Sequence, residues 1–350
     1  MKSVTHVITT IELGGAEKQL LILAKQQIIM GFRVSIVFLK GKPELANKFY
    51  EIGVQDLVSL DGMPIHKQLL RLKALLKGEV NVHAHLPRAE LLVALSLNSK
   101  IRMIVSRHNA EQFFPGAPKM LSVALSRFVV SKSTSVIAIS SAVSEFLIER
   151  REVKNEEKIE IIYYGSAAIP SELTKSSVPS RILGTVARLT EQKDYGTLLS
   201  AFSLFLRDYP DYRLQIIGVG HLEAKLKTLA IQLQISENIE WLGKVAEPSK
   251  YIANWDLFIL TSLYEGFGLV LLESMALEIP IVASDNSAIP EVLGADYMGL
   301  ARTSDPKDFV LKMMRLTEEE GRNGALRQLS QNFVRFEPES MARKVCELYA

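Results

Sequence analysis

Short apolar runs alternate with longer amphipathic stretches along almost the whole chain, and this alternation limits the possible folds more than any other feature. In the first half, residues 4–10 predict a strand, residues 15–31 predict a helix that ends at Gly31, and residues 33–41 predict the next strand. Further strands are expected at residues 80–85, 102–107, 135–140 and 159–164. Buried apolar strands that alternate with helices are typical of a parallel, doubly wound sheet.

The same rhythm begins again near residue 181. Strands are expected there at residues 181–188, 212–220, 238–243, 256–262 and 279–284. Between the halves, residues 165–180 (GSAAIPSELTKSSVPS) are rich in Ser and Pro and predict a linker. A chain of 350 residues is long enough for two domains of ordinary size. We therefore expect an α/β protein with two Rossmann-like, doubly wound domains that face each other across a ligand-binding cleft.

Composition and charge narrow the class of protein. The single cysteine, Cys346, cannot form an intrachain disulfide, and the first fifteen residues lack the features of a signal peptide, so a cytoplasmic protein is expected. No window is apolar enough to predict a membrane span. Residues 1–165 contain 22 Lys and Arg against 15 Asp and Glu, whereas residues 166–350 contain 19 against 24. This excess of positive charge indicates an anionic partner for the first half, although an accidental imbalance explains it equally well.

Two glutamates, Glu265 and Glu273, flank a glycine-containing loop that follows the strand expected at 256–262. Ligands of open α/β sheets bind outside the carboxyl ends of the strands. Gly266 and Gly268 would let the backbone approach a ligand, and a helix that begins near Leu269 would present N–H groups to an anion such as a diphosphate. A carboxylate accepts hydrogen bonds from sugar hydroxyls and repels phosphate. A loop charge and a solvated helical residue are the alternative, but the glycines and the strand-to-helix context favour a ligand site.

Three separated segments resemble the retaining glycosyltransferases of family 4, which have the GT-B fold. Residues 265–284 are similar to the E-x7-E signature of the family, residues 184–202 to its second donor-site segment, and residues 13–20 (LGGAEKQL) to its glycine-rich loop after the first strand. The segments occur in the expected order and in the expected halves. The resemblance implies a metal-independent hexosyltransferase type of enzyme that moves a sugar from a nucleoside diphosphate to a hydroxyl.

The resemblance also implies roles for individual residues. Glu273 is similar to the glutamate that holds the nucleotide ribose, and Glu265 to the one that faces the donor sugar. Arg188 and Lys193 resemble the basic pair that binds the diphosphate, where two cations would stabilise the leaving group. His108 resembles a histidine beside the reacting sugar, although a lone histidine is more often structural. The other residues expected at the donor site are glycines and their neighbours: Gly14, Gly15, Gly218, Gly220, Gly266, Phe267, Gly268, Leu269 and Val270.

No cofactor or metal is expected. Residues 216–223 nearly form a dinucleotide-binding fingerprint, but Glu223 replaces its third glycine and Glu240 lies inside the next expected strand, which disfavours NAD. His83 and His85 share one face of a strand, yet no cysteine or carboxylate stands at ligand spacing, so a metal site is not predicted. A role on the acceptor side is an alternative for either histidine. The chain contains no Asp-x-Asp, the usual acidic metal-binding motif.

Some positions depart from the family pattern. Tyr164 and Ala167 stand where Asn and Asp are common at the entrance to the linker, and Glu278 replaces a glycine that would favour the end of a helix. Residues 66–77 (HKQLLRLKALLK) combine leucines with basic side chains. This helix could rest on an anionic membrane, but packing against the sheet with a solvated basic face is the favoured interpretation.

We expect an acceptor-side domain at residues 1–165, a nucleotide-sugar-binding domain at 166–337, and a helix at 338–350 that crosses back to the first domain. The donor is expected to carry UDP rather than GDP, and a lipid-linked or envelope saccharide fits the hydroxyl acceptor. Peripheral contact with the inner face of a membrane is compatible with the charge, and no nucleic acid is expected as a partner. A nucleotide-sugar epimerase of the same fold and a catalytically silent donor-binding subunit remain as alternatives.

Overall fold

The computed structural model describes residues 2–97, 101–166 and 180–350, and it divides the chain into two units. The first unit contains the described residues from Lys2 to Gly165 together with Phe336–Ala350, and the second contains those between Ser166 and Arg335. The linker expected at 165–180 lies almost wholly outside the described residues, as does Ala167.

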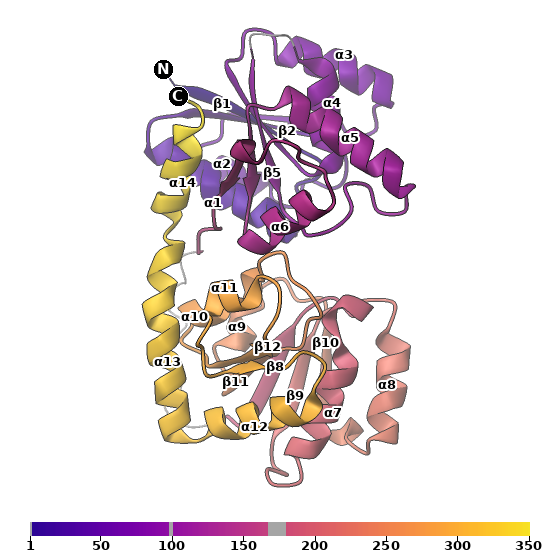
Figure 1. Ribbon diagram of the computed structural model, residues 1–350, viewed down its shortest axis with the longest axis vertical. Helices are drawn as coiled ribbons and strands as arrows, with labels where there is room; N and C mark the ends of the chain where they lie inside the picture. Colours follow the sequence, from indigo (N-terminus) through magenta and orange to yellow (C-terminus); the bar gives the residue numbers. More distant parts are fainter. Residues whose placement is uncertain (1, 98–100, 167–179) are drawn as a thin grey trace. The chain divides into compact units, whose positions relative to one another are not determined.

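The first unit is built on a parallel sheet whose seven strands, among the described residues, follow the order β3-β2-β1-β4-β5-β6-β7. Its strands are β1 (Ser3–Ile8), β2 (Arg33–Phe38), β3 (Asp56–Ser59), β4 (Asn81–His85), β5 (Arg102–Arg107), β6 (Ser135–Ala138) and β7 (Ile159–Ile161). Its helices are α1 (Gly15–Ile29), α2 (Ala46–Glu51), α3 (Ile65–Leu75), α4 (Pro87–Ser96), α5 (Lys119–Lys132), α6 (Ser141–Glu149) and α14 (Pro338–Glu347). In Figure 1, α1 and α14 cover one face of this sheet, and α3, α4 and α5 lie on the other.

The second unit repeats the architecture with a parallel sheet, in which the described strands have the order β10-β9-β8-β11-β12-β13. Its strands are β8 (Ile182–Val186), β9 (Arg213–Ile217), β10 (Ile239–Gly243), β11 (Leu257–Leu260), β12 (Ile281–Ser284) and β13 (Leu300–Ala301). Its helices are α7 (Tyr195–Phe205), α8 (Glu223–Gln232), α9 (Ser249–Ile252), α10 (Leu269–Ala276), α11 (Ile289–Leu293), α12 (Pro306–Thr317) and α13 (Glu319–Phe333). Short 3₁₀ turns occur in both units. They are η1 (Glu156–Lys158) in the first unit, η2 (Glu191–Lys193) and η3 (Ser236–Asn238) in the second, and η4 (Val334–Phe336) at the boundary between the two units.

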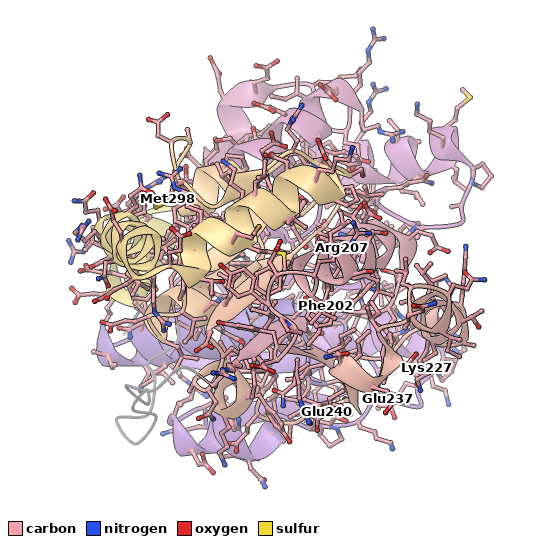
Figure 2. The ribbon with its side chains drawn as sticks, turned by 90° about the horizontal axis from the view of Figure 1, so that it is seen from below. Phe202, Arg207, Lys227, Glu237, Glu240 and Met298 are labelled. Atoms are coloured by element: carbon pink, nitrogen blue, oxygen red, sulfur yellow. The ribbon has the colours of Figure 1, made fainter. Side chains whose placement is uncertain are left out.

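Large apolar side chains fill the interior of the second unit. Phe202 of α7 is fully buried, and Figure 2 shows it in the interior while Glu237 and Glu240 lie near the outer edge. Gly184 in β8 makes room for Trp255, because a Cβ atom on this glycine would lie 2.1 Å from the indole ring. Any side chain at Gly184 would therefore displace the core.

Helix α3 settles the interpretation of the basic leucine-rich segment in the first unit. Leu72 and Leu76 are buried, whereas Lys67, Arg71 and Lys73 are exposed. Leu72 and Leu76 therefore pack inward, whereas the basic residues, together with Leu70, which is 67% exposed, form a solvated outer face. In the described part of the chain, no helix combines the length and apolar character needed to cross a membrane.

Candidate functional site

The strand order of the second unit determines where its loops meet. Strand β8 lies between β9 and β11, so successive strands are added on one side of β8 up to β10 and on its other side from β11 onward. Parallel strands end at the same edge, and the loops that leave β8 and β11 diverge around a crevice at such a switch point. The loop after β8 carries Arg188 and Lys193, and the loop after β11 carries Glu265. The fold therefore brings three of the sequence-predicted residues to one edge of one sheet.

Lys193 and Glu265 form a buried ion pair at this edge. Lys193 Nζ lies 2.5 Å from Glu265 Oε1, and the side chains are only 12% and 9% exposed. Ser262 Oγ donates to the same carboxylate oxygen at 2.6 Å, and the Glu265 backbone N–H donates to Ser287 Oγ at 2.8 Å. Both partners are thus desolvated and held in fixed positions, which is the arrangement that stabilises charge most effectively.

Hydrogen bonds to backbone carbonyl groups hold the two loops together around this pair. The Leu263 N–H donates to the Gln192 carbonyl at 2.7 Å, and Gln192 Nε2 donates to the Tyr264 carbonyl at 2.9 Å. Thr261 Oγ1 donates to the Lys193 carbonyl at 2.9 Å. Four of these supporting residues were not predicted from the sequence: Gln192, Thr261, Ser262 and Ser287. The only local indication of their role was the pair of hydroxyl residues that follows the β11 strand.

Arg188 lies in the same loop as Lys193 but is exposed, and its guanidinium has no hydrogen-bond partner among the described residues. Two glycines keep this loop close to the one after β9. A Cβ atom on Gly218 (φ 148°) would lie 1.9 Å from the Ala187 carbonyl oxygen, and one on Gly220 would lie 2.2 Å from that of Leu189. These glycines therefore allow the close approach of two backbones beside Arg188.

Helix α10 follows the Glu265 loop and begins in the predicted place. Its N-cap, Gly268, has a φ of 84°, a left-handed conformation that glycine adopts without strain. Phe267 is buried in the core, while Gly266, Leu269 and Val270 are half-buried. Glu273 lies about one turn into α10 and is also half-buried. The first-turn amide groups and the Glu273 carboxylate thus belong to one short helix at the switch-point edge.

After the end of α10, a glutamate occupies the position where the family pattern has a glycine. Glu278 takes a left-handed conformation itself, with a φ of 55°. A non-glycine residue in this region costs about 1 kcal/mol. The helix stops at Ala276 despite the substitution, so the departure from the family pattern strains the chain without lengthening the helix.

Gly14 and Gly15 lie at the switch point of the first unit, between β1 and α1. Gly14 is the N-cap of α1, and a Cβ atom there would lie 2.2 Å from Glu17 Oε2. Thr10 Oγ1 donates to Glu17 Oε1 at 2.6 Å, and burial raises the pKa of Glu17 above its usual value. The carboxylate of Glu17 therefore lies over the glycine loop, where a diphosphate is predicted to approach.

His108 follows β5 and is linked to other side chains through both ring nitrogens. Nδ1 pairs with the Tyr164 hydroxyl, and Nε2 lies 3.2 Å from His85 Nδ1. Tyr164, which replaces the more common asparagine, thus provides a polar contact of its own. His85 and its neighbour His83 are both buried in β4, so neither faces solvent on an acceptor surface.

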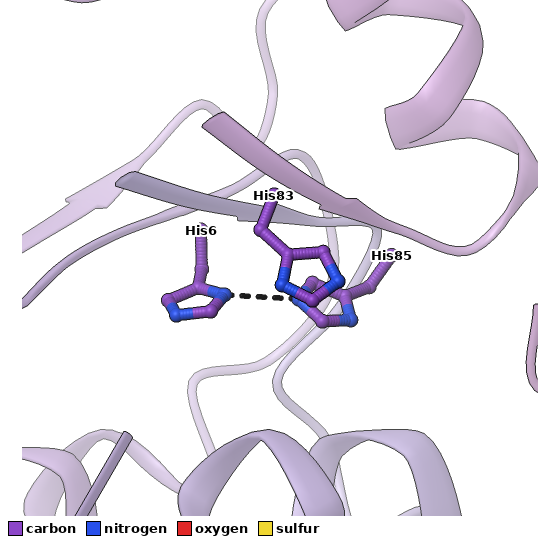
Figure 3. A group of neighbouring side chains, drawn as sticks. All are labelled: His6, His83 and His85. Carbon is purple, nitrogen blue, oxygen red and sulfur yellow. Dashed lines mark hydrogen bonds between the residues drawn. The ribbon is translucent and has the colours of Figure 1, made fainter. Parts of the chain in front are cut away.

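Three histidines in this region come close enough for a metal site to be considered. Ring nitrogens of His6, His83 and His85 lie within 4.8 Å of one another (Figure 3). However, the His83 and His85 rings are stacked with centroids 4.2 Å apart, so their in-plane lone pairs do not converge. All six nitrogens also have hydrogen-bond partners. The geometry therefore favours a hydrogen-bonded cluster, and the prediction of no metal remains to be tested by metal analysis.

Burial keeps these histidines neutral. It lowers the pKa of His6 to about 4, and burial together with nearby Arg107 lowers that of His108 to about 3. The pKa values of His83 and His85 are also well below the ordinary value, mainly because of burial. Glu90 differs, because burial raises its pKa to about 7 despite the opposing effect of Arg107.

We expect the free energy of unfolding to fall as the pH is lowered from about 6.5 towards 4. The unfolded chain binds protons at its histidines in this range, whereas the buried His6, His83 and His85 and the half-buried His108 stay neutral. Each such proton contributes about 1.4 kcal/mol per pH unit, and Glu90 works in the opposite direction over the same range. Urea unfolding at pH 7 and pH 5 measures the change. His83→Gln should reduce the slope of the unfolding free energy against pH by the equivalent of about one proton. Equal stability at both pH values would contradict the assignment of neutral histidines.

In a comparison with known proteins, each half of the chain matches a glycosyltransferase family model. Residues 13–166 match the model "Glycosyltransferase Family 4", and residues 172–333 match "Glycosyl transferases group 1". Together the two matches include most of the chain. A solved structure of Anabaena HepE in complex with UDP and glucose is 17% identical, with a TM-score of 0.83 and 99% coverage of both chains. The fold is therefore GT-B, as the sequence predicted.

Two curated relatives extend the comparison. The amylovoran biosynthesis glycosyltransferase AmsK of Erwinia amylovora is 34% identical over 41% of this chain and 37% of its own length. The N-acetylgalactosamine-N,N'-diacetylbacillosaminyl-diphospho-undecaprenol 4-alpha-N-acetylgalactosaminyltransferase of Campylobacter jejuni is 26% identical over 67% of this chain and 65% of its own length. The matched part of the chain thus spans from about a third to just under two thirds of these relatives.

Proposed function

Because each half of the chain matches a glycosyltransferase family model, we propose that it transfers a sugar from a nucleoside diphosphate to a hydroxyl with retention of anomeric configuration. The buried Lys193–Glu265 pair at the switch point of the second unit is the observation that carries this proposal. A structural role alone does not require a buried ion pair at the edge where α/β sheets bind ligands. UDP is the proposed nucleotide, supported by the UDP in the HepE complex.

Each group at this edge has a proposed task. Arg188 and Lys193 bind the diphosphate, the N–H groups at the start of α10 support it, and Glu273 accepts hydrogen bonds from the ribose. Glu265 faces the donor sugar. Lys193 carries three N–H donors and uses one on Glu265, which leaves donors for phosphate oxygens. The pairing of a cation for phosphate with a carboxylate for sugar hydroxyls matches the chemistry of a nucleoside diphosphate sugar.

In the proposed reaction, the bond between the sugar C1 and the diphosphate oxygen breaks, and a new bond forms between C1 and the acceptor oxygen on the same face. The proton of the acceptor hydroxyl passes to an oxygen of the leaving diphosphate. Arg188 and Lys193 neutralise the charge that develops on that group, so no divalent cation is required. His108 stays neutral beside the sugar, because its low pKa makes it unsuited to act as an acid.

We place the acceptor on the first unit and propose a saccharide of the cell envelope, carried on a lipid. The name of the Campylobacter relative, which specifies a diphospho-undecaprenol substrate, supports this class. The basic outer face of α3, with Lys67, Arg71 and Lys73 exposed, supports peripheral contact with an anionic membrane at its cytoplasmic face. Flotation with vesicles of anionic and neutral lipid tests that contact directly.

A panel of nucleotide sugars tests the function. UDP sugars are expected to raise the melting temperature of the protein, and the best of them should be slowly hydrolysed in the presence of EDTA. Stabilisation by NAD and by no nucleotide sugar would refute the proposal. Release of an epimerised sugar nucleotide would instead identify an epimerase, and tight donor binding with no transfer or hydrolysis would identify a silent subunit.

Replacing Glu273 with alanine should weaken binding of the donor by about 10- to 100-fold, because a charge-assisted hydrogen bond to the ribose contributes about 1.5–3 kcal/mol. Calorimetry with the UDP sugar selected from the panel measures the affinity. Glu237→Ala, on an exposed turn near the outer edge in Figure 2, is the matched control and should bind normally. Unchanged affinity of the Glu273 variant would remove the proposed ribose contact.

A further inference from the structure

A continuous row of side chains crosses the first unit from the end of β5 to helix α1. We call it the histidine row; it consists of Tyr164, His108, His85, His6 and Gln27. His85 Nε2 lies 3.0 Å from His6 Nδ1, the contact drawn as a dashed line in Figure 3, and His6 Nε2 lies 2.8 Å from Gln27 Oε1. With the contacts of His108 already described, four hydrogen bonds connect the Tyr164 hydroxyl to the Gln27 amide.

The amide oxygen of Gln27 determines the direction of every hydrogen bond in the row. Oε1 can only accept, so His6 must carry its proton on Nε2. A neutral imidazole has one N–H group and one lone pair, which makes His6 Nδ1 an acceptor for the Nε2–H of His85. By the same argument, His85 Nδ1 accepts from the Nε2–H of His108. His108 Nδ1 is then the acceptor for the Tyr164 hydroxyl.

The orientation of the Gln27 amide is held by a second set of contacts. Its Nε2 donates to the Tyr349 hydroxyl at 3.1 Å, so that hydroxyl is left to donate to His83 Nδ1 at 2.8 Å. His83 Nε2–H then donates to Ser106 Oγ at 2.7 Å. Tyr349 is the penultimate residue, and its carbonyl accepts from Arg102 at 2.5 Å. In this orientation of the amide, the C-terminal segment completes the hydrogen bonds of Gln27 Nε2, and turning the amide over would require every member of both sets of contacts to reverse together.

Burial makes a reversal at any single position of the row costly. Gln27 and His6 are 0% exposed and His85 is 2% exposed, so water is not available to replace a lost partner. A tautomer of the wrong kind at any one position would leave two N–H groups, or two lone pairs, facing each other. An unsatisfied buried polar group costs about 1–3 kcal/mol, which is enough to keep one tautomer dominant. The low pKa values of the histidines agree with a neutral row.

We propose that Gln27, held by Tyr349, is a positioning residue that fixes the tautomer and ring orientation of His108 through His6 and His85. The catalytic part of this inference rests on the proposed function, since it assumes that His108 lies beside the reacting sugar. The opposite tautomer of His108 would turn the hydroxyl hydrogen of Tyr164 away from the ring and reverse the hydrogen-bond polarity at this end of the row. Gln27 would thus act on the sugar site without touching it.

Imidazole nitrogen NMR on the full-length protein, labelled with ¹⁵N-histidine, tests the tautomers without any need for activity. In the wild type, His6, His85 and His108 should all show the pattern of a neutral ring with hydrogen on Nε2. Gln27→Met keeps the bulk of the side chain but removes both polar groups, and Tyr349→Phe removes the hydroxyl that orients the amide. In both variants the His108 signal should change from pure Nε2–H to a mixture of tautomers.

Gln68→Met is the matched control, because Gln68 is an equally buried glutamine of the first unit that donates to the Leu39 and Leu60 carbonyls outside the row. It should lose stability and keep the wild-type His108 signal. In the transfer assay, Gln27→Met should lower kcat about 10-fold with little change in donor KM, whereas Gln68→Met should not.

The possible failures are distinguishable from one another. Hydrogen on Nδ1 of His108 in the wild type, or an unchanged His108 signal in both row variants, would overturn the assignment of Gln27. A changed signal with normal kcat would overturn its catalytic consequence alone. If the wild type transfers no sugar at all, the proposed function fails, and the NMR result still decides whether Gln27 sets the tautomer.

Discussion

Replacing Glu265 with glutamine should lower kcat for sugar transfer by about 10²- to 10³-fold, the loss typical when one preorganised electrostatic group is removed from an active site. Glutamine keeps the size of the side chain and one acceptor oxygen, so Ser262 can still donate. The negative charge opposite Lys193 is lost, however, and the ammonium group is left desolvated without its counterion. The side chain that should orient the donor sugar is then held only by weaker hydrogen bonds to a neutral oxygen.

The kinetic pattern distinguishes this role from a structural one. Affinity for UDP alone should change by less than about threefold, because the carboxylate is proposed to face the sugar rather than the nucleotide. Glu223→Gln, which breaks the exposed Lys227–Glu223 pair on α8, is the control for loss of a carboxylate and should retain full activity. Wild-type kcat in a folded Glu265→Gln protein would show that the buried pair only stabilises the loop.

Most of the strands could be predicted because each is a short apolar run between turn signals. All eleven strands expected from the sequence are present, with ends that differ by a few residues. The two that were missed lack this signal: β3 (Asp56–Ser59) is a half-buried edge strand, and β13 is only two residues long. Edge strands bury little apolar surface, so periodicity gives weak information about them.

The contacts within the candidate site of the second unit could be predicted from the sequence less well than its fold. The resemblance to family 4 identified Lys193 and Glu265 as separate site residues, but their contact depends on β8 and β11 being neighbours, which periodicity does not reveal. Ser262 and Ser287 support Glu265 from two different loops, and neither belongs to a recognisable motif. Such supporting hydrogen bonds follow from tertiary packing, so they appear only in the structure.

The contacts of the histidine row were even harder to predict from the sequence, because they join residues that are far apart along the chain. Gln27 and Tyr349 are separated by 322 positions in the sequence yet share a hydrogen bond. His6, His83 and His85 belong to adjacent strands, so their rings come together only after β1 pairs with β4. Spacing along the chain predicted that His83 and His85 share a face, but it could not show that both are buried and fully hydrogen-bonded.

Replacing Arg188 with alanine should lower kcat/KM for transfer by about 10²- to 10³-fold while the free energy of unfolding changes by less than about 0.5 kcal/mol. This combination is expected because Arg188 is exposed and its side chain has no hydrogen-bond partner among the described residues, so its removal leaves no buried group unsatisfied. The guanidinium is proposed to bind the diphosphate as it leaves. Urea unfolding and transfer kinetics on the same protein sample measure both quantities.

Arg188→Lys separates charge from geometry. Lysine keeps the positive charge but cannot form the two parallel N–H contacts that arginine makes with a phosphate, so activity should recover only in part. Arg207→Ala removes another exposed arginine of the second unit, labelled in Figure 2, and should leave transfer unchanged. Full activity of the Arg188→Ala variant would mean that Lys193 and the α10 amide groups neutralise the leaving group by themselves, since they are the remaining donors proposed for the diphosphate at this edge of the sheet.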